Sequence, residues 1–353
     1  MDGISANTDA GSLTLSELKD YIKGLEEPSY RAAQIFSWIH ERRVTSFDEM
    51  TDISKKLREK LKEDCFIPFL ETEERLISKI DGTRKYLFKT RDEEYIETVL
   101  MRYEYGVTIC VSTQVGCAMG CVFCASGIDG RKRNLSAYEI LSQIYTVSCD
   151  IDERIGHVVV MGMGEPLDNY DNVVRFIRLL TDERGYNLSA RNITVSTCGI
   201  VPGIKKLSEE GIPLTLALSL HASDQATREK IMPVAKRYGL DEVLKECDEY
   251  FKKTGRRVTY EYALIDSVND TDEHARALGA LFKGKDAHIN IIPVNPGGRD
   301  ENFKSSRKAA LEFKKKLEKY KINATIRRET GRDINGACGQ LRSRHNKEQQ
   351  QLS

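Results

Sequence analysis

A chain of 353 residues, 40% hydrophobic and 31% charged, can bury one large core, with or without a small companion domain. No stretch approaches the ~20 apolar residues that cross a bilayer, and the first residues do not look like a secretory signal, so we expect a cytoplasmic protein without a membrane partner. The formal net charge is zero, but residues 301–353 hold fourteen Lys/Arg against six Asp/Glu, a net of +8 that leaves −8 for the rest; this distribution suits an RNA-facing patch and also a solvated helix face.

The first hundred residues predict a small helical accessory domain that leads into a β-extension. Thr14 and Glu17 have the spacing of a capping box at the start of a helix. The next helix, SYRAAQIFSWIHERR, places five apolar residues on one stripe, namely Ala33, Ile35, Phe36, Trp38 and Ile39. ISKKLREKLKED predicts a third helix, and LISKIDGTRKYLFKT predicts a hairpin with Asp81 and Gly82 at its turn. We place this domain at residues 1–100.

From about Val107 the pattern changes to alternating strands and helices. Short apolar segments predict strands that begin at Val107, His157, Ile193, Leu214, Val258, His288 and Asn323. Alternation of this kind predicts a parallel sheet, and about six such units are fewer than the eight of a full barrel. The expected fold class is therefore α/β, a partial (β/α)6 barrel. We assign residues 101–335 to this core and residues 336–353 to a further loop with a basic tail.

The nine cysteines are odd in number and unevenly clustered, which argues against a disulfide scaffold and leaves them for metal or redox chemistry. Three of them, Cys117, Cys121 and Cys124, form a C-x3-C-x2-C pattern just after the first strand, where a barrel keeps its functional groups. A structural zinc site usually takes four ligands in two pairs. A four-iron, four-sulfur cluster can take three thiolates and leave one iron open to a substrate. The pattern therefore favours a cluster.

Seven motifs carry a resemblance to a known family, and they occur in the family's order. They are IETV (96–99), CVSTQVGCAMGCVFCASG (110–127), MGMGEPLDN (161–169), VSTCGIVP (195–202), SLHA (219–222), NIIPVNP (290–296) and DINGACGQL (333–341). Over nearly its whole length the chain resembles the radical S-adenosylmethionine (SAM) superfamily and, within it, the RlmN family of adenosine C2 methyltransferases. The resemblance implies a [4Fe-4S] cluster and two SAM molecules per turnover as cofactors, and a monomeric enzyme.

The resemblance also implies partners and a chemical rationale. Its expected substrate is 23S rRNA at the peptidyl transferase centre, with tRNA next to the anticodon as a second substrate, and an electron donor such as flavodoxin or ferredoxin feeds the cluster. Adenine C2 lies between two ring nitrogens and is too electron-poor to attack the methyl group of SAM, whereas a carbon radical can add there. Whether tRNA is a substrate, and which reductant acts, the sequence leaves open.

Residue roles follow from the same resemblance. Cys338 attacks one SAM and becomes S-methylcysteine, and a 5′-deoxyadenosyl radical made from a second SAM at the cluster takes a hydrogen from that methyl group. The methylene radical then adds to C2. Cys110 attacks the sulfur of Cys338, forms a disulfide and releases the base. Glu97 is the expected proton acceptor, which either takes the ring proton or assists the release of the base.

The expected SAM contacts lie at the ends of strands. Gly164 and Glu165 receive the ammonium group of SAM. The other contacts are Ser196, Ser219, Leu220, His221 and Asn295. The remaining cysteines, Cys65, Cys149, Cys198 and Cys247, match no family role and are expected to be structural.

Two alternatives stay open at this point. The Cfr relatives methylate C8 of the same adenosine; they read MGMGEA where this chain has Glu165 and Pro166, and that difference favours C2. The chain departs from both in carrying Asn335 and Gly336 where Asp-Ala is usual. The second alternative is a non-catalytic, zinc-bound RNA-binding protein with the same fold.

Overall fold

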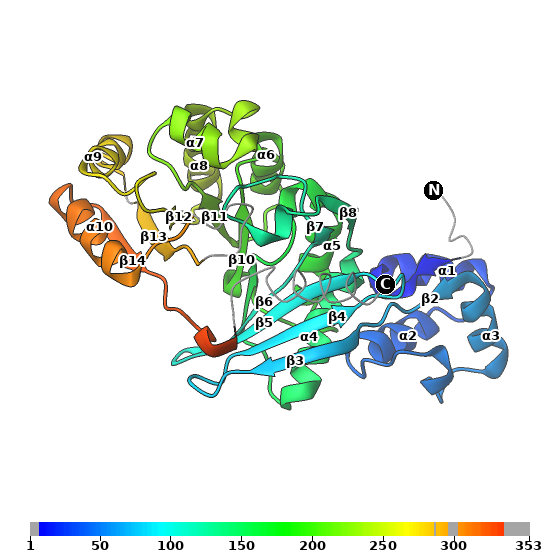
Figure 1. Cartoon of the computed structure of the whole chain (residues 1–353). Helices are drawn as coiled ribbons and strands as arrows, with labels where there is room; N and C mark the ends of the chain where they lie inside the picture. The colour runs from blue at the N-terminus through cyan, green and yellow to red at the C-terminus, as the bar shows by residue number, and fades with distance from the viewer. Residues whose placement is uncertain (1–6, 286, 296–302, 335–353) are drawn as a thin grey trace.

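The computed structural model describes residues 7–285, 287–295 and 303–334, and a ten-stranded sheet forms its centre (Figure 1). From edge to edge its order is β14-β13-β12-β11-β10-β9-β6-β5-β4-β3. Neighbours from β6 to β14 pair in parallel. Neighbours from β3 to β6 pair antiparallel. In the described part of the chain the sheet stays open between β14 and β3, so the predicted partial barrel is confirmed.

The strands of this sheet are β3 (Glu71–Ile77), β4 (Arg84–Lys89), β5 (Tyr95–Tyr103), β6 (Gly106–Cys110), β9 (His157–Val160), β10 (Ile193–Thr197), β11 (Thr215–Ser219), β12 (Val258–Leu264), β13 (His288–Pro293) and β14 (Asn323–Ile326). The connecting helices are α4 (Ala137–Ile151), α5 (Tyr170–Thr181), α6 (Val201–Glu209), α7 (Gln225–Ile231), α8 (Leu240–Thr254), α9 (Asp272–Leu281) and α10 (Arg307–Lys319). Each predicted strand of the barrel begins within one residue of the observed one. Sequence patterning located these strands because their apolar residues join one continuous core with the helices.

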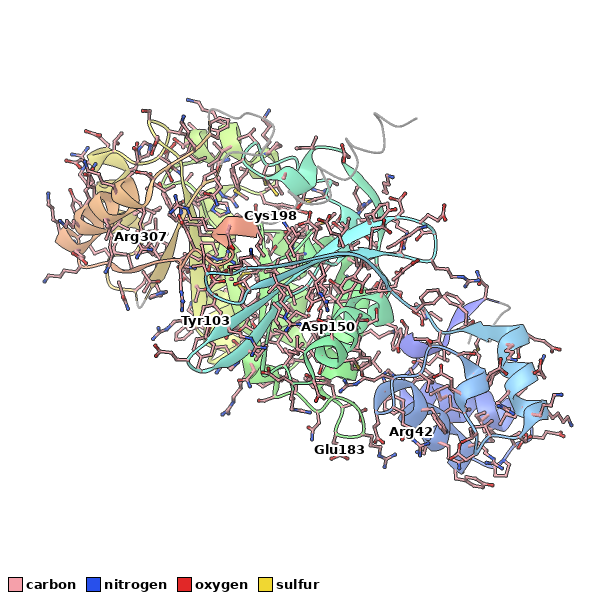
Figure 2. All side chains as sticks on the ribbon, turned by 60° about the horizontal axis from the view of Figure 1, so that its bottom comes forward. Arg42, Tyr103, Asp150, Glu183, Cys198 and Arg307 are labelled. Carbon is pink, nitrogen blue, oxygen red and sulfur yellow. The ribbon has the colours of Figure 1, made fainter. Side chains whose placement is uncertain are left out.

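The β-extension is continuous with the barrel. β5 runs through residue 100 and pairs with β6, so one sheet carries both parts. On the outside, Asp150 near the end of α4 accepts hydrogen bonds from Arg84 Nη1 (2.8 Å) and Tyr86 Oη (2.7 Å) of β4, which ties the extension to a barrel helix (Figure 2). The division of the chain at residues 100 and 335 stays a prediction.

Three short helices form the N-terminal domain, which lies at one end of the molecule (Figure 1). They are α1 (Leu15–Gly24), α2 (Tyr30–His40) and α3 (Lys55–Asp64), with the strand pair β1 (Thr8–Asp9) and β2 (Cys65–Phe66) beside them. The capping box of Thr14 and Glu17 at the start of α1 is confirmed.

The predicted apolar stripe on α2 is wrong at one position. Ile35, Phe36 and Ile39 are buried, but Ala33 is exposed and Ala32 is buried instead. The spacing explains the correction: Ala32 precedes Ile35 by three residues and Phe36 by four, whereas Ala33 lies one position, roughly 100°, further around the helix.

None of the described helices is both long enough and apolar enough to span a bilayer.

Candidate active site

The parallel strands present two different faces. In β9, β10 and β13, burial alternates with a period of two residues. Val158, Val195 and Ile289 lie on the face that joins the main core, whereas Ser196 and Asn290 are only half-buried. Because alternate side chains of a strand share a face, the half-buried polar set lines the inside of the barrel, the side on which such a fold binds its ligand.

The three-cysteine loop is fixed to the barrel at several points. β7 (Gln114–Gly116) and β8 (Arg131–Asn134) form a short antiparallel pair that frames it. Gly116 has a φ of +79°, and a Cβ there would lie 2.0 Å from the carbonyl oxygen of Gly130, so only glycine allows this close approach. The N–H of Cys117 donates to the same oxygen over 2.9 Å, and the N–H of Val122 donates to Ile231 of α7 over 3.1 Å.

The three thiols of this loop influence one another electrostatically. Burial, and to a smaller extent the charge of Cys124, raises the pKa of Cys117 to about 12, and the same two causes raise the pKa of Cys121. Without a cation Cys117 and Cys121 therefore stay protonated at neutral pH, and a cationic centre would reverse that preference. Within the described ranges no three His, Cys, Asp or Glu side chains are placed to hold a single metal ion. Three half-exposed thiols on one loop fit a larger iron–sulfur cluster.

An apolar shell covers one side of the loop. Cys121, Val122 and Phe123 pack against a small hydrophobic cluster that includes Ala222 and Ile231. The ring of Phe123 meets that of His221 edge-on, with 4.9 Å between centroids. The loop therefore contacts the strand ends at which SAM contacts are expected.

In the pair Gly164-Glu165 after β9, hydrogen bonds to the backbone and to Gln114 hold Glu165 in place. The Glu165 side chain is buried, and its carboxylate accepts from the N–H groups of Cys198 (2.7 Å) and Leu167 (3.1 Å). Burial raises its pKa, while the hydrogen bonds from Cys198 and Thr197 work in the opposite direction. Glu165 N–H in turn donates to Gln114 Oε1 over 2.9 Å. The carboxylate expected to receive the ammonium of SAM thus also holds the ends of β9 and β10 together.

The carboxyl-terminal residues of β10 and β11 lie near one another. Ser196 Oγ and Ser219 Oγ are 3.4 Å apart. His221 has a φ of +56°, and its Nδ1 accepts from the N–H of Ala263 over 2.9 Å. Burial, with a smaller contribution from the charge of Arg228, lowers the pKa of His221 to about 3, so its ring is neutral.

The remaining expected SAM contacts differ in exposure. Leu220 is buried completely, and its N–H donates to the carbonyl of Glu261 over 3.0 Å. Asn295 is exposed and lies two residues beyond the end of β13. Their contacts with SAM stay predictions.

Sequence reasoning missed Arg228, although its side chain is fully buried beside this site. Its Nη2 donates to the carbonyl of Cys198 over 2.7 Å, and its Nε donates to that of Leu220 over 3.3 Å. One guanidinium thus joins the ends of β10 and β11. Cys198, expected to be structural, also lies within the packed interior (Figure 2). The available signal was spacing: Arg228 lies three residues before the buried Ile231 and so on the same face of α7.

A second group of residues forms around Cys110, the last residue of β6. Cys110 is buried with Val99 and Met101 of β5 in a separate small cluster. Glu97 lies two residues before Val99 on the same strand and so on the same face. Its carboxylate is 3.1 Å from Lys85 Nζ, and both side chains are buried. The structure therefore brings together Cys110 and Glu97, which the sequence analysis had singled out separately.

Charged groups of both signs act on the thiol of Cys110. Burial raises its pKa, and the charge of Glu97 adds to that effect. The positive charges of Arg327, just beyond β14, and of Lys85 act in the opposite direction. Cys338 lies outside the described residues.

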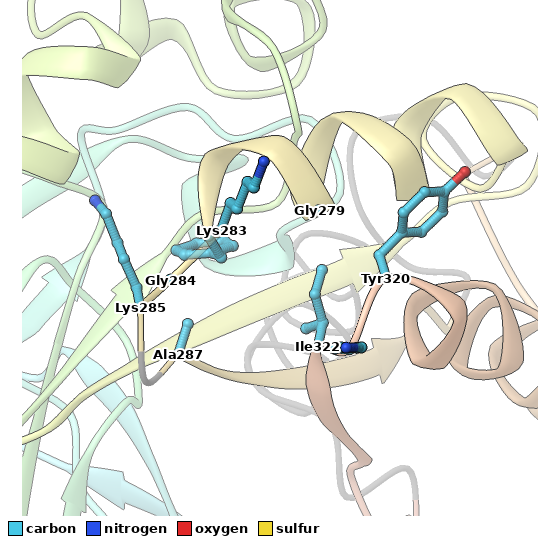
Figure 3. Close-up of a pocket in the computed structure, with 9 residues that line it drawn as sticks. Gly279, Lys283, Gly284, Lys285, Ala287, Tyr320 and Ile322 are labelled. Atoms are coloured by element: carbon cyan, nitrogen blue, oxygen red, sulfur yellow. The ribbon is translucent and has the colours of Figure 1, made fainter.

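The described residues also form a pocket of about 170 Å³ that is unrelated to these groups (Figure 3). Lys283, Lys285, Tyr320 and Lys321 line it, together with Ala287 and Ile322. It lies just before the first residues of β13 and β14, whereas the cysteine loop follows the carboxyl end of β6. It is therefore not the candidate active site.

Comparisons with known proteins agree on one family. Residues 9–67 match the ribosomal RNA large subunit methyltransferase N-terminal domain, and residues 111–278 match the radical SAM superfamily. A protein of Lachnoclostridium phytofermentans named "Probable dual-specificity RNA methyltransferase RlmN" is 51% identical over 342 residues, 97% of this chain and 96% of that protein. One of the same name from Clostridium novyi is 50% identical over 331 residues, 94% of this chain and 96% of its own. The chain belongs to the RlmN family.

A solved structure supports the same placement. The radical SAM methyltransferase from Sphaerobacter thermophilus superposes with a TM-score of 0.88 at 41% identity, covering 94% of this chain and 98% of its own. As an RlmN family member, the chain is a radical SAM RNA methyltransferase, an enzyme class that uses a [4Fe-4S] cluster and SAM. The non-catalytic zinc-protein alternative is therefore wrong. The residues matched to the N-terminal domain include all three helices of the accessory domain.

Proposed function

We propose that this enzyme methylates C2 of adenosine in 23S rRNA, and in tRNA as a second substrate, through the cysteine pair Cys338 and Cys110. The observation that carries the proposal is the placement of Cys110. A buried thiol stands at the carboxyl end of β6, on the same strand that leads into the cysteine loop, with Glu97 and Lys85 beside it. An inert core cysteine needs no such charged neighbours.

Cys117, Cys121 and Cys124 would hold the cluster, and Gly164, Glu165, Ser196, Ser219, Leu220, His221 and Asn295 would hold SAM. When bound, the cluster and SAM supply the radical chemistry that an electron-poor carbon requires. The neutral ring of His221 packs against Phe123 of the cysteine loop and accepts a hydrogen bond from the backbone of β12. His221 therefore fixes the cysteine loop relative to the ends of β11 and β12. Glu165 holds together the neighbouring strand ends, those of β9 and β10.

Cys338 would carry the methyl group and become joined through it to the base. To restore the aromatic ring, the adduct gives up one electron, which the cluster would accept, and the C2 proton, which Glu97 takes. Cys110 then attacks the sulfur of Cys338. A sulfur–sulfur bond forms, the carbon–sulfur bond breaks, and its electron pair stays on the methylene carbon, which takes up a proton to become the methyl group. Burial raises the pKa of Cys110, and the positive charges of Arg327 and Lys85 work against that rise, toward the thiolate that this attack needs.

Removal of the resolving thiol tests this proposal. Cys110→Ala should accumulate a covalent protein–RNA adduct, seen as a slow, ribonuclease-sensitive band, whereas Cys338→Ala and the double variant should give none. Cys247→Ala is the matched control, because Cys247 is also a buried cysteine but lies on α8, outside the barrel. Normal turnover by Cys110→Ala without trapped RNA would overturn the two-cysteine mechanism.

The position of the new methyl group needs its own measurement. Mass spectrometry of nucleosides from rRNA and tRNA of a deletion strain should show loss of 2-methyladenosine from both. Loss of 8-methyladenosine would instead assign the Cfr reaction, and loss from rRNA alone would remove tRNA as a substrate.

A further inference from the structure

The turn between β3 and β4 makes hydrogen bonds to residues 331–333, a segment more than two hundred residues further along the chain. Ser78 Oγ donates to Asp333 Oδ1 over 2.6 Å, and the N–H of Lys79 donates to Asp333 Oδ2 over 2.9 Å. In the other direction, the N–H of Gly331 donates to Asp81 Oδ2 over 3.0 Å. Figure 1 shows the short helix η7 (Arg332–Ile334) lying beside the tips of the extension's hairpins.

The turn is longer than a hairpin requires, and its extra residues make these contacts. Two residues suffice to join antiparallel strands, yet six residues, 78–83, separate β3 from β4. Asp81 divides its carboxylate between two tasks: Oδ1 accepts from the N–H of Thr83 within the turn (3.0 Å), and Oδ2 accepts from Gly331. Ser78 is buried, and its Oγ also accepts from the N–H of Ile80 (3.1 Å).

Both carboxylates of the contact are ionised at neutral pH. Desolvation opposes the charge of Asp81, but hydrogen bonds from Thr83 and Gly331 lower its pKa to about 2. The hydrogen bond from Ser78 lowers the pKa of Asp333. Gly331 has a φ of +62°, and a Cβ there would lie 3.0 Å from Thr83 Cγ2. Glycine at this position permits the close approach of segment and turn.

We propose that the turn of residues 78–83 anchors the segment that carries Cys338, with Asp333 as the positioning residue. The inference rests on the proposed function, because it concerns the meeting of Cys338 and Cys110. Cys338 follows Asp333 by five positions, so its Cα can lie at most ~18 Å from that of Asp333. The preceding part of the segment is held as well, since the N–H of Arg327 donates to the carbonyl of Ile291 over 2.8 Å. A tether of this kind raises the effective concentration of one thiol at the other.

The β-extension then has a role in positioning both cysteines of the reaction. β5 of the extension supplies Glu97, and β6 ends at Cys110. The anchor lies at the turn of the same extension, so one sheet would position both the resolving thiol and the loop of the methyl carrier. The Asp of the DINGACGQL motif then acts through backbone placement and need not touch RNA or SAM.

The test measures the Cys110–Cys338 disulfide in the full-length, cluster-free protein equilibrated with glutathione and glutathione disulfide. Two thiols are oxidised while one glutathione disulfide is reduced to two glutathione molecules, and mass spectrometry gives the fraction bridged. Asp333→Ala and Ser78→Ala should lower the effective concentration of the two thiols about tenfold. Asp333→Asn, which keeps one acceptor oxygen, should fall between them and the wild type.

Glu329→Ala is the matched control, because Glu329 is an exposed acid of the same segment, and it should leave the disulfide equilibrium unchanged. An unchanged equilibrium in Asp333→Ala, or an equal loss in Glu329→Ala, would overturn the anchor. The rate of hydrogen exchange at the amides of Lys79 and Gly331 tests the anchor independently of the disulfide. This rate should increase in Asp333→Ala. Absence of any disulfide in the wild type would refute the cysteine pairing of the proposed function. In that case the exchange measurement still decides the anchor: faster amide exchange in Asp333→Ala would support the anchor, and unchanged exchange would refute the anchor.

Discussion

Replacing Gly164 by alanine should be among the most damaging single-methyl changes in this enzyme. Gly164 has a φ of +105°, and a Cβ there would lie 2.7 Å from both Gln114 Cβ and Thr113 Oγ1. Thr113 cannot withdraw easily, since its N–H donates to the carbonyl of Met163 over 2.8 Å. The substitution therefore combines backbone strain with a steric overlap that the surroundings cannot relieve.

The two costs can be estimated separately. A non-glycine residue in a sparsely populated backbone region costs ~1–3 kcal/mol, and an extra methyl group forced into a packed site costs ~1–3 kcal/mol. We expect a loss of about 4 kcal/mol in the free energy of unfolding, the middle of the combined range. Natural domains have only ~5–15 kcal/mol, so the variant should fold but be fragile. Displacement of Gln114 should also weaken SAM binding, because Gln114 Oε1 accepts from Glu165 N–H.

Urea unfolding of the cluster-free protein, followed by circular dichroism, measures the difference. Gly255→Ala is the control: Gly255 has a φ of +65° at the end of α8 but nothing within 4 Å of a built Cβ. It should lose only ~1–2 kcal/mol, the cost of the left-handed conformation. If Gly164→Ala loses no more stability than Gly255→Ala, the steric part of this reasoning is wrong.

The other predictions concern the cluster and the response to acid. Alanine at Cys117, Cys121 or Cys124 should remove iron and activity together, because each change removes one of three protein ligands; full iron content in any of them would show a misassigned ligand. Burial lowers the pKa of His40 from 6.5 to about 3 in the folded protein. The contribution of the neutral, buried ring to stability is therefore complete above pH 6.5, the pKa of the unfolded state, and is lost as the pH falls toward the pKa of the folded state. Between pH 7 and pH 5 the wild type should therefore lose about 2 kcal/mol more than His40→Phe in urea unfolding, and parallel losses in the two proteins would contradict a neutral buried His40.

Local sequence patterns are sufficient to predict the order of elements and the type of chemistry. The strands of the barrel follow from local apolar patterns, which is why their starts were located within one residue. The cysteine motif also needs no tertiary information, because its three thiols lie within eight residues of one another. The one error on α2, Ala33 in place of Ala32, was a misreading of the local pattern, because helical spacing by itself places Ala32 on the face of Ile35 and Phe36.

Tertiary structure decided which polar side chains are buried and what they hold. Arg228 reads as a surface residue of a short helix, yet it is buried and joins the ends of β10 and β11. Glu165 proves to bind its own backbone, and Lys85 pairs with Glu97 inside the sheet. Asp333 meets Ser78 across 255 positions of the chain. Such contacts depend on the distance between residues after folding, and the free energy of burying a charge depends on the partners found there, neither of which a local pattern contains.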